Sequence, residues 1–490
     1  MQGENKKRKM MKNDKNENAL FELINGNGNG VTWDTFCSEY WEKKPLIVRQ
    51  GAVAYENTLT RQSFIDVLKK DTKNNIEYAR MKICKYDNEE KMIIEPKEEF
   101  ASGEQVDEYF NQGYSVQFYQ PQRENDAFFQ LMSEFESSFG VLSGASVYLT
   151  PAKTQALAPH HDDVEVFVLQ TEGRKHWKLY EPILELPGEH SGDIDPKTLG
   201  EPMMEVTLNQ GDMMYLPRGV IHQALADSET FSTHVTVSVY QYQSWANFLE
   251  VALPRVVRQA FDEDVRFRKG LPINYLNYMG SVHDMKGDSK QSEAFVCALK
   301  ELISYLPSHV DSTLVHQTAD EAAMDFVKNR LPPVNAPCHI ESIDTPFCLA
   351  DPSFWRLVVT PNAEGDIDLT VVHSLNNDRT CHMGASTDNY ADDGESEDED
   401  EIPQGDEDET PQGEEGCSDH ESTSSQSEEE QAGTIHLPDT ALSVILHLLK
   451  TYPQTSTVAS VHKQVPHLSE DIIRGALICL EQGGLLVLEK

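Results

Sequence analysis

The chain lacks several features that would place it in a class at once. Its eight cysteines lie far apart in 490 residues and none forms a Cys-x-x-Cys pair, which excludes a disulfide framework and a cysteine zinc site and fits a reducing compartment. No run of 18 apolar residues occurs, so we expect no membrane-spanning helix. The short apolar run 19–24 is broken by Glu22, so we expect no secretory signal.

Apolar residues and basic residues are also scarce. Hydrophobic residues make up 39% of the chain, which predicts that part of it lies outside any packed core. Lys and Arg number 41 against 82 Asp and Glu, a net charge of -41. This charge disfavours a protein that coats nucleic acid and favours basic partners.

About half of the excess negative charge lies in one stretch. Residues 388–430 contain 20 acidic residues and no Lys or Arg. The stretch is interpreted either as a salt-sensitive attractor for basic proteins or as a solvating spacer. The basic run Lys6–Lys9 is interpreted either as a nuclear import signal or as a solvated tail.

Apolar patterning predicts a β-rich body from about residue 114 to residue 240, followed by helices. A helix is expected over 33–40 and a strand over 45–48. Short strands are expected at 147–149, 164–169, 177–180, 213–216 and 235–240, with a turn at Glu172-Gly173. Short strands at close spacing favour a sandwich or small barrel. Helical periodicity follows from Trp245 to about residue 335, including a helix over 294–306.

The C-terminal part is expected to form a winged-helix module interrupted by the acidic stretch. Two strands are predicted at 355–360 and 367–373, two helices at 439–449 and 470–482, and a closing strand at 484–488. Between residues 435 and 490 four basic residues stand against five acidic ones, so direct DNA binding is doubtful.

One motif carries a candidate metal ligand. The stretch 211–222 reads Gly-x5-Pro-x-Gly-x2-His, in which the glycines and the proline shape tight turns and His222 opens the next strand. The spacing matches the second motif of cupin barrels and places one imidazole toward the barrel interior.

A second motif lies about 60 residues earlier, at 159–165. Because residues two apart on a strand face the same side, His160 and Asp162 can point inward together. With His222 they form two histidines and one carboxylate, the facial triad of non-haem Fe(II) oxygenases. The run alone is more often a solvated loop, and its pairing with the motif at 211–222 is what favours a metal site. Barrels of this type also bind Mn or Zn.

Lys175 bears on which cofactor the barrel takes. A lysine that faces into a barrel is costly unless it meets an anion, and 2-oxoglutarate offers a carboxylate. Strand alternation alone leaves Arg174 and Lys178 as equal candidates.

These motifs resemble those of the JmjC ribosomal oxygenases, and in particular the nucleolar branch described as bifunctional lysine-specific demethylase and histidyl-hydroxylase. The resemblance rests on Trp41–Leu46, the His160-x-Asp162 block, Glu172–Trp177, Tyr215–Gln223 and Thr236–Gln241, and it continues in Phe267–Pro272 and Tyr278–Gly280. It covers roughly residues 31–385 and 435–490.

The resemblance implies an α+β fold: a JmjC/cupin double-stranded β-helix barrel, a helical dimerisation domain and a C-terminal winged helix with a disordered acidic insert. The expected division is a disordered basic tail (1–30), a catalytic domain (31–245), a dimerisation domain (246–335), a winged-helix module (336–387 and 434–490) and the insert (388–433).

The resemblance also implies site residues. His160, Asp162 and His222 match the iron ligands, Lys175 matches the 2-oxoglutarate anchor, and Tyr148 and Ser238 match the substrate cleft. Thr236 is expected beside the cosubstrate, with core packing as an equal alternative. The remaining cleft positions are Ser146, where the family usually has Asn, and Gln117, where the nucleolar branch has Arg. Both positions border the peptide site, so the resemblance does not determine which substrate the protein takes.

His161 is interpreted as a structural neighbour rather than a fourth ligand, and His234 as a histidine packed near the metal. The implied activity is that of an Fe(II)-, 2-oxoglutarate- and O2-dependent oxygenase that hydroxylates a histidine of a ribosomal protein. Histone H3 lysine demethylation in transcriptional repression is the second implied role. The expected state is a homodimer in the nucleus, specifically the nucleolus. The alternatives are a non-catalytic chromatin or ribosome-assembly scaffold and, more distantly, a cupin isomerase or sugar-binding barrel.

Overall fold

The structure is a computed structural model that describes residues 19–26, 31–49, 59–70, 76–87, 90–98, 100–285, 289–335, 337–362, 366–384 and 433–488. The predicted acidic insert, apart from Gly433, and the basic run Lys6–Lys9 therefore lie outside the described residues. Among the helices in these ranges, none has the length and apolar character needed to cross a membrane.

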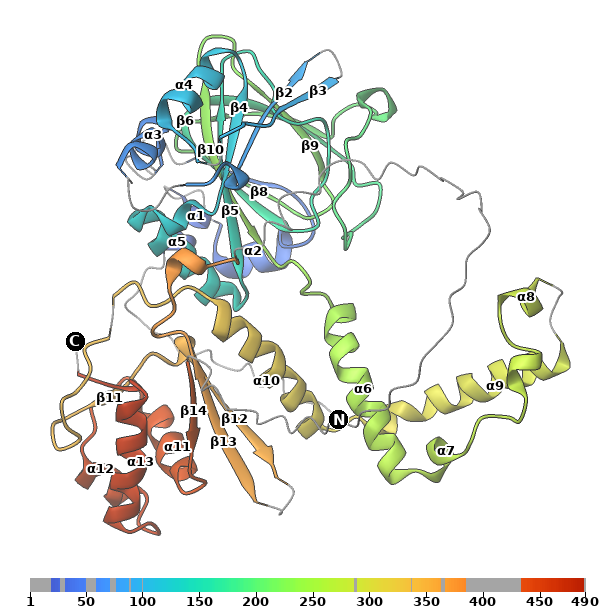
Figure 1. Cartoon of the computed structure of the whole chain (residues 1–490), viewed down its shortest axis with the longest axis vertical. Helices are drawn as coiled ribbons and strands as arrows, with labels where there is room; N and C mark the ends of the chain where they lie inside the picture. The colour runs from blue at the N-terminus through green and yellow to red at the C-terminus, as the bar shows by residue number, and fades with distance from the viewer. Residues whose placement is uncertain are drawn as a thin grey trace, which may run out of the picture.

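The first half of the chain forms a curled sheet with helices around it (Figure 1). Its helices are α1 (Ala19–Asn25), α2 (Trp33–Glu39), α3 (Arg61–Lys70), α4 (Gly103–Asn111) and α5 (Asp126–Phe139). Its strands are β1 (Leu46–Val48), β2 (Met81–Asp87), β3 (Glu90–Ile94), β4 (Ser115–Tyr119), β5 (Ser143–Thr150), β6 (Glu165–Tyr180), β7 (Met204–Asn209), β8 (Met213–Leu216), β9 (Ile221–Ala226) and β10 (Ser232–Val239).

The ten strands form one antiparallel sheet in the order β1-β8-β6-β10-β5-β4-β2-β3, with β7 and β9 also paired to β6. The long strand β6 is the centre of the barrel, because its first half pairs with β8 and β10 and its second half with β7 and β9. The predicted barrel is present, and the strands expected at 45–48, 147–149, 213–216 and 235–240 lie within β1, β5, β8 and β10.

One predicted turn is wrong. Residues 165–169 and 177–180 belong to the single strand β6, with no turn at Glu172-Gly173. The pairing of β6 with β10 skips Thr171, which forms a bulge where the sequence suggested a reversal. Two residues later Gly173 adopts φ +63, and a Cβ there would lie 1.7 Å from the carbonyl oxygen of Phe231, so the glycine permits the close approach of that backbone.

Two helical segments also depart from prediction. α5 lies inside the stretch expected to be β, because Phe128, Met132 and Phe135 are buried at helical spacing. α1 lies inside the stretch predicted as a disordered tail, and its Leu20 and Ile24 are almost fully buried against the barrel core. At these residues the predicted tail is a packed helix.

An aromatic cluster joins the N-terminal helices to the barrel. Phe36 of α2 is fully buried, with its ring 4.9 Å from that of Tyr215 and 6.0 Å from that of Phe167. Trp41 stacks on Phe139 and Tyr215 at 5.1 and 5.9 Å. Full burial of such side chains contributes about 1.5–3 kcal/mol each, so this cluster holds β1 and α2 in place.

The second half contains a helical region and a C-terminal module (Figure 1). The region consists of α6 (Trp245–Glu263), α7 (Val265–Arg268), α8 (Ser281–Asp284), α9 (Lys290–Tyr305) and α10 (Ser312–Asn329). The module contains β11 (Cys348–Leu349), β12 (Trp355–Pro361), β13 (Ile367–His373), β14 (Thr434–Leu437), α11 (Ala441–Thr451), α12 (Val458–Gln464), α13 (Glu470–Gln482) and β15 (Leu486–Val487). Short 3-10 helices are η2 (Tyr78–Arg80), η3 (Pro121–Arg123), η4 (Pro196–Thr198), η5 (Tyr275–Asn277), η6 (Leu306–His309), η7 (Pro352–Phe354) and η8 (Arg379–Cys381).

The C-terminal module has its own apolar core, formed by α11, α13 and the sheet β12-β13-β14. Strands β13 and β14 pair with each other, with Val372 opposite Thr434. The strands before and after the acidic stretch therefore lie side by side in one sheet. The predicted strands and helices are confirmed here, whereas α12 was not predicted. The closing strand β15 pairs with the distant β11.

Candidate metal centre

Three side chains that the motifs singled out converge in the barrel. The carboxylate of Asp162 lies 4.0 Å from Nε2 of His160 and 3.7 Å from Nε2 of His222. One ligand atom from each residue lies within 4.8 Å of the others, and among the described residues this is the one such group of three. Two imidazoles and a carboxylate at this spacing suit a divalent transition metal.

Backbone contacts fix the orientation of both imidazoles. Nδ1 of His160 donates to the carbonyl oxygen of Ala158 at 2.8 Å, and Nδ1 of His222 donates to that of Val220 at 3.1 Å. A proton on Nδ1 leaves the lone pair on Nε2, and Nε2 is the atom turned toward Asp162. The rings are therefore set in the tautomer that ligates a metal.

The chain is folded locally to bring the ligands together. The backbones of His160 and His222 pair with each other, at 3.2 and 2.8 Å. Gly219, at φ +88, donates its N–H to the carbonyl of Asp162 at 3.0 Å. His222 opens β9 as predicted, whereas His160 and Asp162 lie in the loop before β6 rather than on a strand.

Burial keeps His222 in its neutral form. Desolvation, with His160 nearby, lowers the pKa of His222 to about 4. A neutral imidazole is the form that binds a metal. His161 does not join the group, because its ring does not line the cavity. Its backbone N–H donates to the hydroxyl of Ser191 at 2.8 Å.

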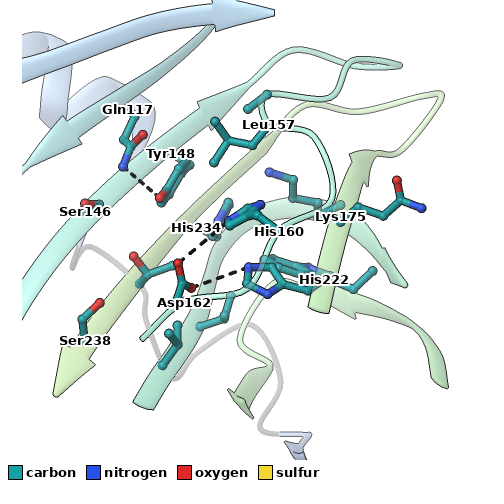
Figure 2. A pocket seen from close by; sticks show the side chains of 17 residues that line it. Gln117, Ser146, Tyr148, Leu157, His160, Asp162, Lys175, His222, His234 and Ser238 are labelled. Atoms are coloured by element: carbon teal, nitrogen blue, oxygen red, sulfur yellow. Dashed lines mark hydrogen bonds and ion pairs between the residues drawn. The ribbon is translucent and has the colours of Figure 1, made fainter. Parts of the chain in front are cut away.

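The triad opens into a cavity of about 210 Å³ (Figure 2). All the remaining residues predicted for the site line this same cavity. They come from four neighbouring strands: Gln117 from β4, Ser146 and Tyr148 from β5, Lys175 from β6, and Thr236 and Ser238 from β10. Their roles stay predictions, but the structure places them together.

Lys175 is the buried cation of the cavity. Its side chain is 3% exposed, and Nζ donates to the hydroxyl of Thr150 at 3.2 Å. Within the described part of the chain, no carboxylate forms an ion pair with it, whereas Arg174 and Lys178 are half-exposed and pair with Asp227 and Glu205. Burial lowers the pKa of Lys175 to about 7. Of the three candidates, Lys175 is the one that faces the cavity.

The opposite wall is polar and aromatic. Nε2 of Gln117 donates to the hydroxyl of Tyr148 at 2.9 Å. The Tyr148 ring stacks on His234 at 4.7 Å, and Trp177 meets His234 edge-on at 5.5 Å. Burial, with Lys175 and His222 nearby, lowers the pKa of His234 well below its usual 6.5. His234 is therefore a packed, neutral ring.

Sequence reasoning missed two supporting features. Thr150 holds Lys175, and its position two residues after Tyr148 on β5 was the available signal. Glu165, fully buried, accepts a hydrogen bond from the Tyr215 hydroxyl and lies 3.6 Å from Arg218. Burial raises the pKa of Glu165 to about 7, and no local signal revealed this long-range contact.

A family model described as JmjC domain matches residues 117–248, the stretch that contains the triad and Lys175. Ribosomal oxygenase 1 of Danio rerio is 36% identical over 308 residues, covering 61% of this chain and 55% of that protein. The bifunctional lysine-specific demethylase and histidyl-hydroxylase NO66 of Aedes aegypti is 35% identical over 310 residues, covering 61% and 47%.

Residues 117–248 therefore match a JmjC domain, and the chain is similar to proteins named as ribosomal oxygenases. The predicted resemblance is confirmed, and the ten-stranded sheet confirms the predicted barrel fold. The chain spans about half the length of the curated relatives it matches. A solved structure of the ribosomal oxygenase YcfD from Escherichia coli, in complex with cobalt and 2-oxoglutarate, is 14% identical and covers 69% of this chain and 84% of that one. The TM-score of that match is 0.39.

Proposed function

We propose that this JmjC ribosomal oxygenase relative is an Fe(II)- and 2-oxoglutarate-dependent protein oxygenase. The observation that carries the proposal is the pairing, in one cavity, of a two-histidine, one-carboxylate group with a buried lysine that has no carboxylate partner among the described residues. A solitary buried lysine is stable only if an anion joins it or if it loses its proton. Both halves of the site thus fit an iron ion and a dicarboxylate.

The residues divide the work between them. His160, Asp162 and His222 would hold the iron through Nε2 and carboxylate oxygens and leave positions for other ligands. When bound together with 2-oxoglutarate and O2, the iron supplies the oxidising power that converts a C–H bond of the substrate to C–OH. Lys175 and Thr150 would hold the far carboxylate of 2-oxoglutarate.

The cavity walls would exclude water and position the substrate. Trp177 and the neutral His234 cover the inner end, where Tyr148 stacks. Gln117 orients the Tyr148 hydroxyl, and Ser146 and Ser238 line the same opening from β5 and β10. Polar groups that hold the substrate at a fixed distance contribute to rate by orientation.

We further propose that the substrate is a histidine of a ribosomal protein. The printed names of the relatives, ribosomal oxygenase and histidyl-hydroxylase, support this class, and the chain's net charge of -41 suits a basic partner. Demethylation of histone H3 lysines in transcriptional repression is the second candidate, supported by the demethylase name of one relative. The nucleolus stays the proposed location, on the basic run Lys6–Lys9.

A homodimer is proposed on the helical region. Outward-facing apolar residues on α9 include Leu299 and Ile303, 50% and 53% exposed, and α6 exposes Val257 and Phe261 to a similar degree. Apolar surface of this extent marks an interaction site. We propose a second copy as the partner.

The test is mass spectrometry of ribosomal proteins incubated with the protein, Fe(II), 2-oxoglutarate and O2. We expect a gain of one oxygen on a histidine of one ribosomal protein, dependent on 2-oxoglutarate and absent with Asp162→Ala. The competing proposal, a non-catalytic scaffold, would be favoured if no protein gained oxygen and if cells carrying Asp162→Ala were unaffected.

A further inference from the structure

A second cleft lies directly outside the metal cavity. It shares Tyr148, His160 and Asp162 with the cavity, so the two are continuous. The outer cleft thus offers a polypeptide a path to the metal cavity. Most of its lining belongs to the barrel, but one lining residue, Met383, comes from the segment that follows β13.

Met383 is fixed in place by a buried network. The guanidinium of Arg123, on η3 of the barrel, donates to the carbonyl oxygens of His382 and Gly384, the residues on either side. The ring of His382 accepts from Gln122 at 2.9 Å and donates from Nε2 to Glu136 at 2.7 Å. His382 and Glu136 are both almost fully buried, so the backbone at 382–384 is held on both sides.

The backbone of Met383 is in an unfavourable conformation. Its φ is +61, the left-handed region, where a residue with a long side chain is uncommon. Such a conformation persists only where the surroundings impose it, and it is found often at functional sites. Here the anchored neighbours impose it, and the result is a methionine side chain directed at the barrel.

The side chain meets β5 at a glycine. A Cβ placed on Gly144 would lie 3.7 Å from Cε of Met383. Gly144 precedes Ser146 and Tyr148 by two and four residues on β5, so all three face the same side. The end of the methionine side chain therefore lies against β5, on the face that continues into the metal cavity.

We propose that Met383 is a specificity-determining residue of the substrate cleft, contributed by the C-terminal half of the chain, and that it packs against an apolar or aromatic side chain next to the oxidised residue. Methionine suits this role because its flexible, polarisable thioether adapts to irregular apolar surfaces and to aromatic rings. The inference rests on the proposed oxygenase function. It adds that the chain's C-terminal half contributes directly to recognition of the polypeptide.

The test uses Met383→Ala and a set of synthetic histidine-containing peptides from ribosomal proteins, in which each flanking residue is replaced by alanine in turn. We expect Met383→Ala to raise the KM for the parent peptide roughly five- to tenfold, with kcat within about twofold. Replacement of one apolar flanking residue should raise KM with the unaltered protein but have little further effect with Met383→Ala, because both changes remove the same contact.

Three controls separate recognition from damage. Met383→Leu should restore most of the lost affinity, since it keeps the apolar volume. Met383→Gly relieves the positive φ, so a fold defect cannot account for its raised KM. Met203→Ala, which removes a methionine that lines neither cleft, should match the unaltered protein. Peptide-independent consumption of 2-oxoglutarate should be equal in all of them.

If the unaltered protein oxidises a peptide and Met383→Ala shows the same KM for every peptide, the inference about Met383 is overturned and the proposed function stands. If KM rises but no flanking position loses its effect, Met383 contacts no substrate side chain and the inference is again overturned. If the unaltered protein oxidises no peptide and consumes no 2-oxoglutarate, the proposed function fails, and the inference fails with it.

Discussion

Replacement of Lys175 by methionine should stabilise the protein in the absence of 2-oxoglutarate and weaken its binding of 2-oxoglutarate. The ammonium group is 3% exposed and has one hydrogen-bond partner, Thr150. Methionine has a similar length and no charge, so it fills the space without the cost of a buried cation. The same change removes the group that we propose pairs with the cosubstrate.

The magnitudes follow from the pKa. Burial lowers the pKa of Lys175 from 10.5 to about 7, so the unfolded chain binds a proton that the folded chain binds less readily. The resulting cost to folding is complete below pH 7 and disappears as the pH rises from 7 to 10.5. Below pH 7 it is about 5 kcal/mol, at 1.36 kcal/mol for each pH unit between the two pKa values. Lys175→Met should therefore raise the unfolding free energy most at or below pH 7.

The loss in binding follows from the missing charge. A hydrogen-bonded ion pair in a buried site contributes about 2–3 kcal/mol, so the Kd for 2-oxoglutarate should rise roughly 30- to 150-fold. In the unaltered protein, affinity should fall as the pH rises above about 7, because Lys175 must then take up a proton to pair.

Anaerobic calorimetric titration of the Fe(II)-loaded protein measures the Kd, and thermal unfolding between pH 6 and 10 measures stability. Lys178→Met is the matched control, since Lys178 lies on the same strand but pairs with Glu205 at the surface. Its effect should be small on both measurements. A Lys175→Met variant that binds 2-oxoglutarate as tightly as the unaltered protein would refute the assignment of Lys175 as its anchor.

Three further predictions concern the metal site and the buried acids. Asp162→Ala should abolish stoichiometric metal binding, measured by metal analysis after desalting, whereas Asp163→Asn, at the adjacent position, should retain it; equal metal contents would contradict the assigned ligand set. Glu165→Gln should raise the melting temperature at pH 8 and not at pH 4.5, because the raised pKa of about 7 makes the ionised acid costly above that pH and burial is its main cause; an equal effect at both values would refute this reasoning. Glu136→Ala should destabilise the protein by about 3–5 kcal/mol in chemical unfolding, since His382 and the N–H of Leu331 would lose their buried partner; a loss under about 1 kcal/mol would show that the contact contributes little.

The metal ligands could be predicted from the sequence, whereas the cosubstrate lysine could not be singled out by alternation. The spacing of Gly219 and His222 specifies a turn and a strand start. On β6, however, Val166 and Val168 face the cavity at even positions, and Lys175 and Trp177 face it at odd positions. The bulge at Thr171 shifts the alternation by one residue. Because the sequence predicted a turn at this point, it could not predict on which side of β6 the Lys175 side chain lies.

Contacts between distant segments account for most of what the sequence did not reveal. Helix α5 was hidden within a stretch of β character, although its buried Phe128, Met132 and Phe135 follow a helical period. The hydrogen bonds that join His382 to Glu136 connect residues 246 positions apart. The sequence around either residue does not predict the contact, because it forms only when the two halves of the chain pack together.

The strand order of the barrel has a consequence for how the protein is made. Leu46 pairs with Tyr215, and Ser143 pairs with Val239. Strand β1 therefore cannot form its hydrogen bonds before β8 has been synthesised, and β5 cannot pair with β10 before β10 has been synthesised. During synthesis the barrel cannot close until β10 has left the ribosome, and until then β1, β4 and β5 expose apolar faces. A pause in translation before residue 232 would prolong that interval, and nascent chains of this length should depend most on chaperones.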